Sequence, residues 1–362
     1  MKKTILSLAV AALALGAAQA QTIVNIGGST AGRTAVHNNI VALLGSLTYA
    51  YDGTSGSPSK ATRAIYSGTY NGESYIVRTY WQGSVEGITP IVDGLQSNQL
   101  MAVSNLTGAS SGGTFVASPA LAPASASTTM NIGFSDIFAS TVNVTAPAVE
   151  DEVAVITFKW FANKGSAGIA NLSPSLVNNL YGSSEQPLSM FTGDPNNALT
   201  SVFPIGRNSS SGTRATAMAV SGYGNVVAVD QYTATVASGV VTGLTLVGNG
   251  GFGSGSSVKD VMNATYSGGV LIGYLGASDF AANGVELTWC GQAWSTANIQ
   301  NGKYDFWGYL HMNRMNTLDA VQLSFYNGLK TNITANPLDS GVLTIGSMNV
   351  GRSADGAPIF PN

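Results

Sequence analysis

The 362-residue sequence predicts an α/β fold, because one local pattern recurs along it. In this pattern a short apolar run leads into a turn of Gly, Ser and Thr, and an apolar stripe at helical spacing follows. Clear examples follow the runs at 22–26 and 201–205. Strands that alternate with helices are typical of layered α/β proteins rather than of all-β sandwiches. The length favours two domains, because single hydrophobic cores stop growing near about 250 to 300 residues.

Residues 1–20 have the organisation of a secretory signal peptide. Lysines at positions 2 and 3 precede an apolar run at 5–15, and Ala18-Gln19-Ala20 has the small residues of a cleavage site. The run is too short to span a bilayer, and no cysteine follows the cleavage site to carry a lipid. We therefore expect a mature protein that starts near Gln21 and is periplasmic or secreted, without a lipid anchor.

The composition excludes several classes of function. Without the two signal lysines, 13 basic residues face 18 acidic ones, a net charge of −5 (15 − 2 − 18), which argues against a nucleic-acid partner. Cys290 is the only cysteine, so an intrachain disulfide is impossible. With His37 and His311 as the only histidines, a zinc site has little material to be built from. We expect no metal and no cofactor.

The first elements of the mature chain place hydroxyl groups at a helix start. Residues 22–26 predict a buried strand, and the glycine-containing turn at 27–32 includes Ser29 and Thr30. Helix starts carry N–H groups without partners, so this turn is a candidate anion cradle. No Gly-Lys-Ser/Thr ending follows, which excludes a nucleotide-binding phosphate loop. One helical face is predicted from Val36, Ile40, Leu43, Leu44 and Leu47.

Two polar excursions interrupt the next part of the chain. Segment 51–74 is rich in Gly, Ser and Tyr and predicts a hairpin or a long loop, and segment 103–129 is expected to cap a surface. Between them we expect a strand at 75–82 and a short helix at 88–95. Pro90 helps to fix where that helix begins, because proline is tolerated only in the first turn.

Further polar groups follow strand ends. Ser84 comes just after the strand at 75–82, and Asp136 ends a strand that enters through Phe134. An almost continuous apolar run at 153–161 then predicts a strand covered on both faces.

Residues 207–213, Arg-Asn-Ser-Ser-Ser-Gly-Thr, form the clearest candidate anion site. They lie between the strand at 201–205 and a helix expected at 214–220. Ser211 and Thr213 supply hydroxyl donors, and Gly212 lets a ligand approach the main chain. Arg207 supplies a forked positive charge that suits a tetrahedral oxyanion. A serine-rich loop with an ordinary helix cap remains the alternative interpretation.

The remaining elements continue the α/β pattern. Ser173 and Pro174 mark the start of a helix within 171–180. We then expect a glycine-rich turn at 248–257, a helix at 258–264, and strands at 270–274 and 304–312. A late helix is predicted from the apolar residues Leu318, Val321, Phe325 and Leu329.

Taken in order, these motifs resemble the periplasmic phosphate-binding proteins that deliver inorganic phosphate to ABC transporters. No single motif is specific, but their order covers most of the mature chain. The resemblance rests on Gly28-Ser29-Thr30, Gln82-Gly83-Ser84, Gly133-Phe134-Ser135-Asp136, Arg207 with Ser211-Gly212-Thr213, and Gly248-Asn249-Gly250-Gly251 running to 268–274.

The resemblance implies a two-lobed periplasmic-binding-protein fold with a hinge, and a dehydrated phosphate between the lobes. Its expected partners are inorganic phosphate and the membrane permease of an ABC transporter, and a monomer is expected. Ser209 and Ser210 depart from the Asp-Gly usual in that family, and Ala31 stands where an aromatic residue is common. The implied ligands are Thr30, Ser84 and Asp136 from the first lobe and Arg207, Ser211, Gly212 and Thr213 from the second.

The same resemblance divides the chain. Lobe I comprises residues 21–158 and a return segment at 304–362, and lobe II comprises 159–303. The chain must cross between lobes about twice, so we expect hinge segments near 158–163 and 301–305.

Two other functions stay open from the sequence. The first is a secreted surface or matrix protein that kept the phosphate-binding fold and lost its ligand. The polar excursions slightly favour it, and the retention of Arg207 and Asp136 argues against it. The second is a hydrolase with Ser211 or another hydroxyl as nucleophile, which needs a base, and both histidines lie far from Ser211 in sequence.

Overall fold

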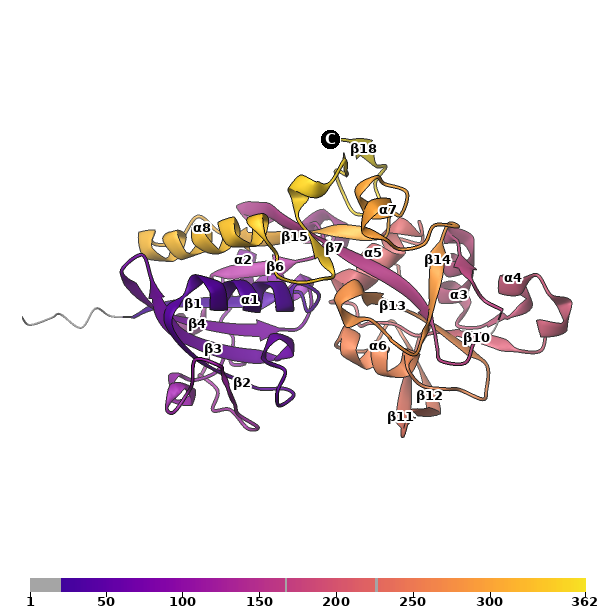
Figure 1. Cartoon of the computed structure of the whole chain (residues 1–362), viewed down its shortest axis with the longest axis horizontal. Helices are drawn as coiled ribbons and strands as arrows, with labels where there is room; N and C mark the ends of the chain where they lie inside the picture. The colour runs from indigo at the N-terminus through magenta and orange to yellow at the C-terminus, as the bar shows by residue number, and fades with distance from the viewer. Residues whose placement is uncertain (1–20, 167, 225–226) are drawn as a thin grey trace, which may run out of the picture.

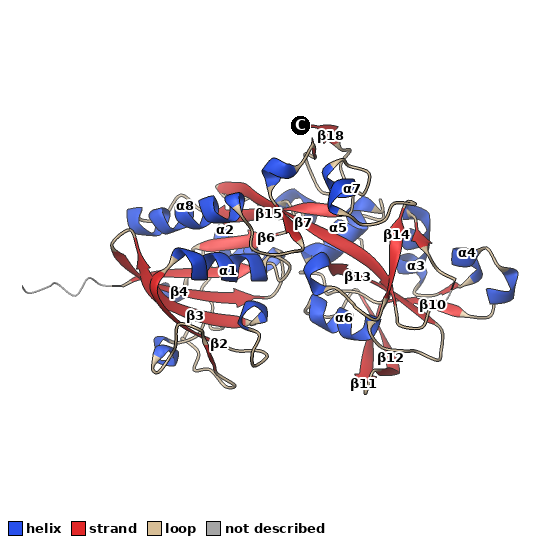
Figure 2. Cartoon of the chain, in the orientation of Figure 1, coloured by secondary structure: helices blue, strands red, loops and turns tan. Residues whose placement is uncertain are grey.

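The computed structural model describes residues 21–166, 168–224 and 227–362 (Figure 1). The predicted signal peptide lies outside the described residues. Strands and helices alternate in two lobes that lie side by side in Figure 2, which confirms the α/β class. None of the helices in the described part of the chain is long and apolar enough to cross a membrane.

The first lobe is built on a mixed sheet with β1 (Thr22–Gly28) near its centre. β1 pairs in parallel with β4 (Glu73–Trp81) and β6 (Ile132–Ser135). β15 (Trp307–Arg314) then pairs antiparallel with β6. The outer strands are β2 (Gly45–Tyr51), β3 (Arg63–Tyr70) and β5 (Thr114–Phe115). Helices α1 (Arg33–Leu43) and α8 (Ala320–Ala335) pack against each other over this sheet, and α2 (Thr89–Asp93) is a short helix near β6.

Strand β7 (Val149–Ala162) connects the two lobes through hydrogen bonds. Its first part pairs with β15 as far as Thr157, and its last part pairs with β13 (Val270–Gly276) from Phe158 onward. Every residue of β7 from Val153 to Ala162 is buried. The long apolar run of the sequence is therefore a strand covered on both faces, as predicted.

The second lobe continues the sheet with β13, β10 (Ser201–Pro204) and β9 (Gln186–Pro187). Helices α5 (Gly212–Val220) and α6 (Gly255–Met262) pack against β13. The other elements of this lobe are β8 (Asn171–Leu172), α3 (Pro174–Ser183), α4 (Ser189–Thr192), β11 (Gln231–Ala237), β12 (Val240–Gly248), β14 (Val285–Trp289) and α7 (Thr296–Gln300).

Aromatic side chains fill the core where the lobes join. Trp160 of β7 is fully buried and stacks on Phe306 and Trp289, with ring centroids 5.1 and 5.7 Å apart. The hydroxyl of Tyr304 donates to the Phe158 carbonyl at 2.9 Å. The segment that precedes β15 is thereby fastened to the middle of β7.

The C-terminal segment runs across both lobes, above the junction in Figure 1. β16 (Val342–Leu343) pairs with β7, and β17 (Val350–Gly351) and β18 (Phe360–Pro361) form a small hairpin. Asp355 accepts hydrogen bonds from the Phe138 N–H at 2.9 Å and the Thr141 hydroxyl at 2.7 Å.

One expectation about local structure was wrong. The predicted first helix ends at Leu43, and Leu47 lies in strand β2, because pairing with β3 overrides the helical spacing of the apolar residues. No element was predicted between 220 and 248, where the structure has the antiparallel hairpin of β11 and β12. Segment 51–74 holds both a loop and the strand β3 of a hairpin.

Candidate anion-binding site

The parallel pairing of β1, β4 and β6 brings three polar loops to one edge of the first-lobe sheet. Gly28 is in register with both Trp81 and Phe134, so the three strands end together. The Ser29 N–H donates to the Phe134 carbonyl at 2.8 Å, and the Gly83 N–H donates to the Gly28 carbonyl at 3.0 Å. The loops that carry Thr30, Ser84 and Asp136 therefore converge where open α/β sheets bind ligands.

Asp136 and Ser84 form a buried pair. The Ser84 hydroxyl donates to Asp136 Oδ1, and the Asp136 N–H donates to Ser84 Oγ at 3.0 Å. Asp136 Oδ2 has no hydrogen-bond partner among the described residues. Burial raises the pKa of Asp136, while the nearby hydroxyls of Ser29 and Thr213 and the charge of Arg207 oppose that rise.

Arg207 reaches from the second lobe to the first. Its side chain is almost fully buried, and Nη2 donates to Thr30 Oγ1 of the first lobe at 3.2 Å. Nε and Nη2 are also held by the carbonyls of Phe252 and Gly253, at 3.1 and 3.0 Å. Nη1 donates to none of the residues that the structure describes. Burial lowers the pKa of Arg207, but a guanidinium stays protonated in proteins.

The N-terminus of α5 faces Asp136 and Ser84. Ser211 is the helix cap, and its Oγ accepts from the Arg214 N–H at 3.3 Å. A Cβ atom at Gly212 would overlap the Asp136 carboxylate and the Ser84 hydroxyl, so only glycine fits at this approach. Thr213 is buried in the first turn. Contacts therefore join Thr30 with Arg207, and Ser84 and Asp136 with Gly212, while Ser211 and Thr213 adjoin Gly212 at the start of α5.

The two lobes touch directly beside this point. The Val85 N–H donates to the Ser210 carbonyl at 3.3 Å. Gly83 has a φ of +153°, and a Cβ there would overlap the backbone of Ser210. Lys60 and Asp279 form a further contact between the lobes, an ion pair of 3.2 Å.

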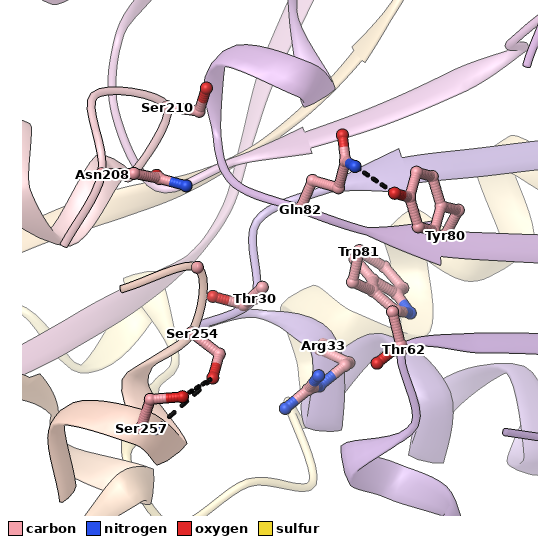
Figure 3. Close-up of a pocket in the computed structure, with 11 residues that line it drawn as sticks. Thr30, Arg33, Thr62, Tyr80, Trp81, Gln82, Asn208, Ser210, Ser254 and Ser257 are labelled. Carbon is pink, nitrogen blue, oxygen red and sulfur yellow. Dashed lines mark hydrogen bonds between the residues drawn. The ribbon is translucent and has the colours of Figure 1, made fainter. Parts of the chain in front are cut away.

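A cavity of about 420 Å³ adjoins the site and is also lined by both lobes (Figure 3). Thr30 belongs to both places, whereas Ser84, Asp136 and Arg207 do not line the cavity. Its one charged wall residue, Arg33, is absent from the sequence prediction. A signal existed, because Arg33 lies in the first turn of α1, where the helix dipole disfavours a cation unless an anion is near.

Neither histidine contacts Ser211. His37 Nδ1 shares a hydrogen bond of 2.7 Å with the Tyr66 hydroxyl. His311 is fully buried on β15, and neither of its ring nitrogens has a partner among the described residues. The geometry gives Ser211 no histidine base. Within the described ranges, no group of three or more His, Cys, Asp or Glu side chains could hold a metal ion.

Comparison with solved structures identifies the fold. A protein from Clostridium perfringens, provisionally assigned as a phosphate ABC transporter substrate-binding protein and solved with bound phosphate, matches with a TM-score of 0.52 and 14% identity. The match covers 90% of this chain and 100% of that chain. The two-lobed periplasmic-binding-protein fold expected from the sequence is confirmed.

Two further structures are similar at lower TM-scores. An ABC-type phosphate transport receptor from Vibrio cholerae has a TM-score of 0.49 and 13% identity over 87% of this chain and 98% of its own. PstS from Borrelia burgdorferi has a TM-score of 0.42 and 15% identity over 90% and 99%. No protein-family model matches the chain. No curated protein matches its sequence.

Proposed function

We propose that this protein is an extracytoplasmic, non-enzymatic solute-binding protein that captures inorganic phosphate between its lobes for delivery to an ABC transporter. The observation that carries the proposal is Arg207, a buried guanidinium at the junction of the lobes with Nη1 left for a ligand. Its recorded hydrogen bonds go to a hydroxyl and two carbonyls, so a bound oxyanion would add the close negative partner that a buried charge needs.

The surrounding groups suit a tetrahedral anion. Thr30, Ser84 and Asp136 would contact it from the first lobe, and Arg207, Ser211, Gly212 and Thr213 from the second. The first N–H groups of α5 add partial positive charge. The Clostridium perfringens protein with this fold was solved with phosphate bound, which supports phosphate as the anion.

The organisation around the site is part of the same proposal. Lobe I comprises 21–158 and 304–362 and lobe II comprises 159–303, in agreement with the exchange of β7 partners at Thr157 and Phe158. Export by the signal peptide at 1–20 would place the monomeric protein outside the cytoplasm, where a membrane permease accepts the phosphate. N-terminal sequencing of exported protein that found Met1 retained would contradict the cleavage.

Calorimetric titration of phosphate into extensively dialysed protein tests the function directly. We expect one site per chain, and Arg207→Ala should weaken binding by about 2 to 5 kcal/mol, the range for breaking a buried charge pair. Arg207→Lys keeps the charge but loses the forked donors, so its loss should be smaller. A parent protein that binds no phosphate would refute the function and leave the secreted matrix role. An Arg207→Ala variant that binds as tightly as the parent would remove Arg207 from the site.

A further inference from the structure

The cavity beside the proposed phosphate site is lined mostly by residues that do not belong to that site. It is lined from the first lobe by Thr30, Arg33, Thr62 and Trp81, and from the second lobe by Asn208 and Ser254, among others. Thr30 is the point of contact with the phosphate site, because its Oγ1 accepts from Arg207. A volume of about 420 Å³ is the size of a small-molecule pocket, and far exceeds the ~30 Å³ share of one water molecule.

Arg33 points into this cavity. Figure 3 shows its guanidinium between Ser257 of α6 and Thr62. The residue is only 6% exposed, and its Nε has no hydrogen-bond partner among the described residues. Nη1 donates to the Ala61 carbonyl at 3.3 Å, and this is the only hydrogen bond found for the side chain within the described part of the chain.

No carboxylate among the described residues forms an ion pair with Arg33. Asp52 and Asp279 lie near enough to act on its charge, but Asp52 forms an ion pair of 2.7 Å with Arg63, and Asp279 forms its ion pair with Lys60. Arg207 adds a second positive charge nearby, which disfavours the charged form of Arg33 further. A close anion would stabilise a buried cation of this kind, because only a nearby opposite charge offsets the cost of desolvation.

We propose that the cavity holds the second acidic group of a small organic phosphate, with Arg33 as its charge partner. The inference rests on the proposed function, because the phosphoryl group of the same ligand would occupy the site formed by Arg207, Asp136 and α5. A carboxylate or a second phosphate on a short carbon chain would lie on the cavity side of Thr30 and accept hydrogen bonds from the free N–H groups of Arg33. The hydroxyls of Thr62, Ser254 and Ser257 suit the polar groups of such a chain.

Binding of three probes to the unaltered protein tests the proposal. The probes are inorganic phosphate, glycerol 3-phosphate, which lacks a second acidic group, and 3-phosphoglycerate, which carries a carboxylate. Pyrophosphate is a fourth probe, in which the second acidic group is a phosphate. We expect 3-phosphoglycerate or pyrophosphate to bind at least about tenfold more tightly than glycerol 3-phosphate, as for one charge-assisted contact.

Arg33→Gln should abolish this preference and leave the affinity for inorganic phosphate within about twofold of the parent. Lys259→Gln is the matched control, because it removes the same charge from α6, beside Ser257, at a residue that does not line the cavity. It should leave the preference intact. Thermal melts establish that both variants fold.

The outcomes separate the two proposals. Phosphate binding without any preference for the diacids overturns the cavity proposal alone, and so does a preference that survives Arg33→Gln. If the protein binds neither inorganic phosphate nor the organic phosphates, both proposals fail. The comparison of ligands on the parent decides the question even if Arg33→Gln does not fold.

Discussion

At the residue scale, Asp136 poses the main electrostatic problem of the site. A carboxylate beside a bound dianion should repel it, because like charges in a water-poor cleft interact strongly. Monohydrogen phosphate avoids the conflict, since its O–H can donate to Asp136 Oδ2, the oxygen without a partner among the described residues. Fully ionised sulfate has no such proton. In the proposed site we therefore predict that Asp136 favours phosphate over sulfate, because it would repel the fully ionised anion.

Asp136→Asn should raise the affinity for sulfate relative to phosphate by about tenfold or more, because removal of one like-charge contact is worth more than about 1.4 kcal/mol. Burial raises the pKa of Asp136, so sulfate binding to the parent should also improve as the pH falls through that pKa. The Asn variant should lack this pH dependence. Competition binding of the two anions measures both effects, and an unchanged ratio would exclude Asp136 from selectivity.

At the scale of elements, the first turn of α5 depends on the absence of one side chain. Gly212→Ala would place a methyl group against Asp136 and Ser84 and hold α5 away from the first lobe. We expect phosphate affinity to fall at least about a hundredfold, because the N–H groups of α5 and Arg207 move together. Gly243→Ala on β12 is the control, since a Cβ there meets nothing within 4 Å. Equal affinities of the two variants would show that α5 does not need this close approach.

Strand β15 carries a pH-dependent contribution to stability. Burial lowers the pKa of His311 to about 3, below its unfolded value near 6.5. The unfolded state therefore binds more protons between these pH values. The free energy of unfolding is highest above about pH 6.5 as far as His311 is concerned, and it decreases as the pH falls. The slope for one histidine approaches about 1.4 kcal/mol per pH unit.

His311→Leu should remove this slope, because neither ring nitrogen has a partner to lose among the described residues. Urea unfolding of parent and variant at pH 7 and pH 5 gives the difference. Comparison with the variant is essential, because Asp355 acts in the opposite direction. Burial raises the pKa of Asp355 to about 6, so its contribution to the free energy of unfolding decreases as the pH rises from about 4 to 6. Parallel stability curves for the two proteins would contradict the expectation for His311.

Local sequence signals were sufficient to predict features that depend on neighbouring residues alone, such as the start of a helix. Ser173 and Pro174 mark the start of α3, and Ser173 caps it as predicted. The sequence placed the seven candidate site residues in strand-end loops and at a helix start, which the structure brings to the junction of the lobes, and their contact with an anion stays a prediction. The end of α1 and the β11–β12 hairpin could not be predicted, because strand pairing decides them. The place of Arg33 in the first turn of α1 was a signal in the sequence, but only its burial separates it from a surface arginine.

At the scale of the whole molecule, three connections join the lobes. β7 exchanges its partners at Thr157 and Phe158, and the segment before β15 runs beside it. The C-terminal segment adds a third, because Asp355 contacts the first lobe while the Asn349 N–H donates to the Gln300 carbonyl of α7 at 3.0 Å.

Hinge closure on phosphate is the expected motion of this arrangement. The contacts of Val85 with Ser210, of Thr30 with Arg207 and of Lys60 with Asp279 each join the two lobes, so we expect opening of the lobes to break them. We expect bound phosphate to favour the form in which these contacts are made, because a ligand shifts such an equilibrium by its differential affinity. Solution scattering should therefore show a larger radius of gyration for phosphate-free protein than for protein at saturation. Arg207→Ala at the same phosphate concentration should stay in the larger form. Superimposable parent profiles, with binding established by calorimetry, would mean that the lobes do not close on phosphate and that hinges near 158–163 and 301–305 are absent.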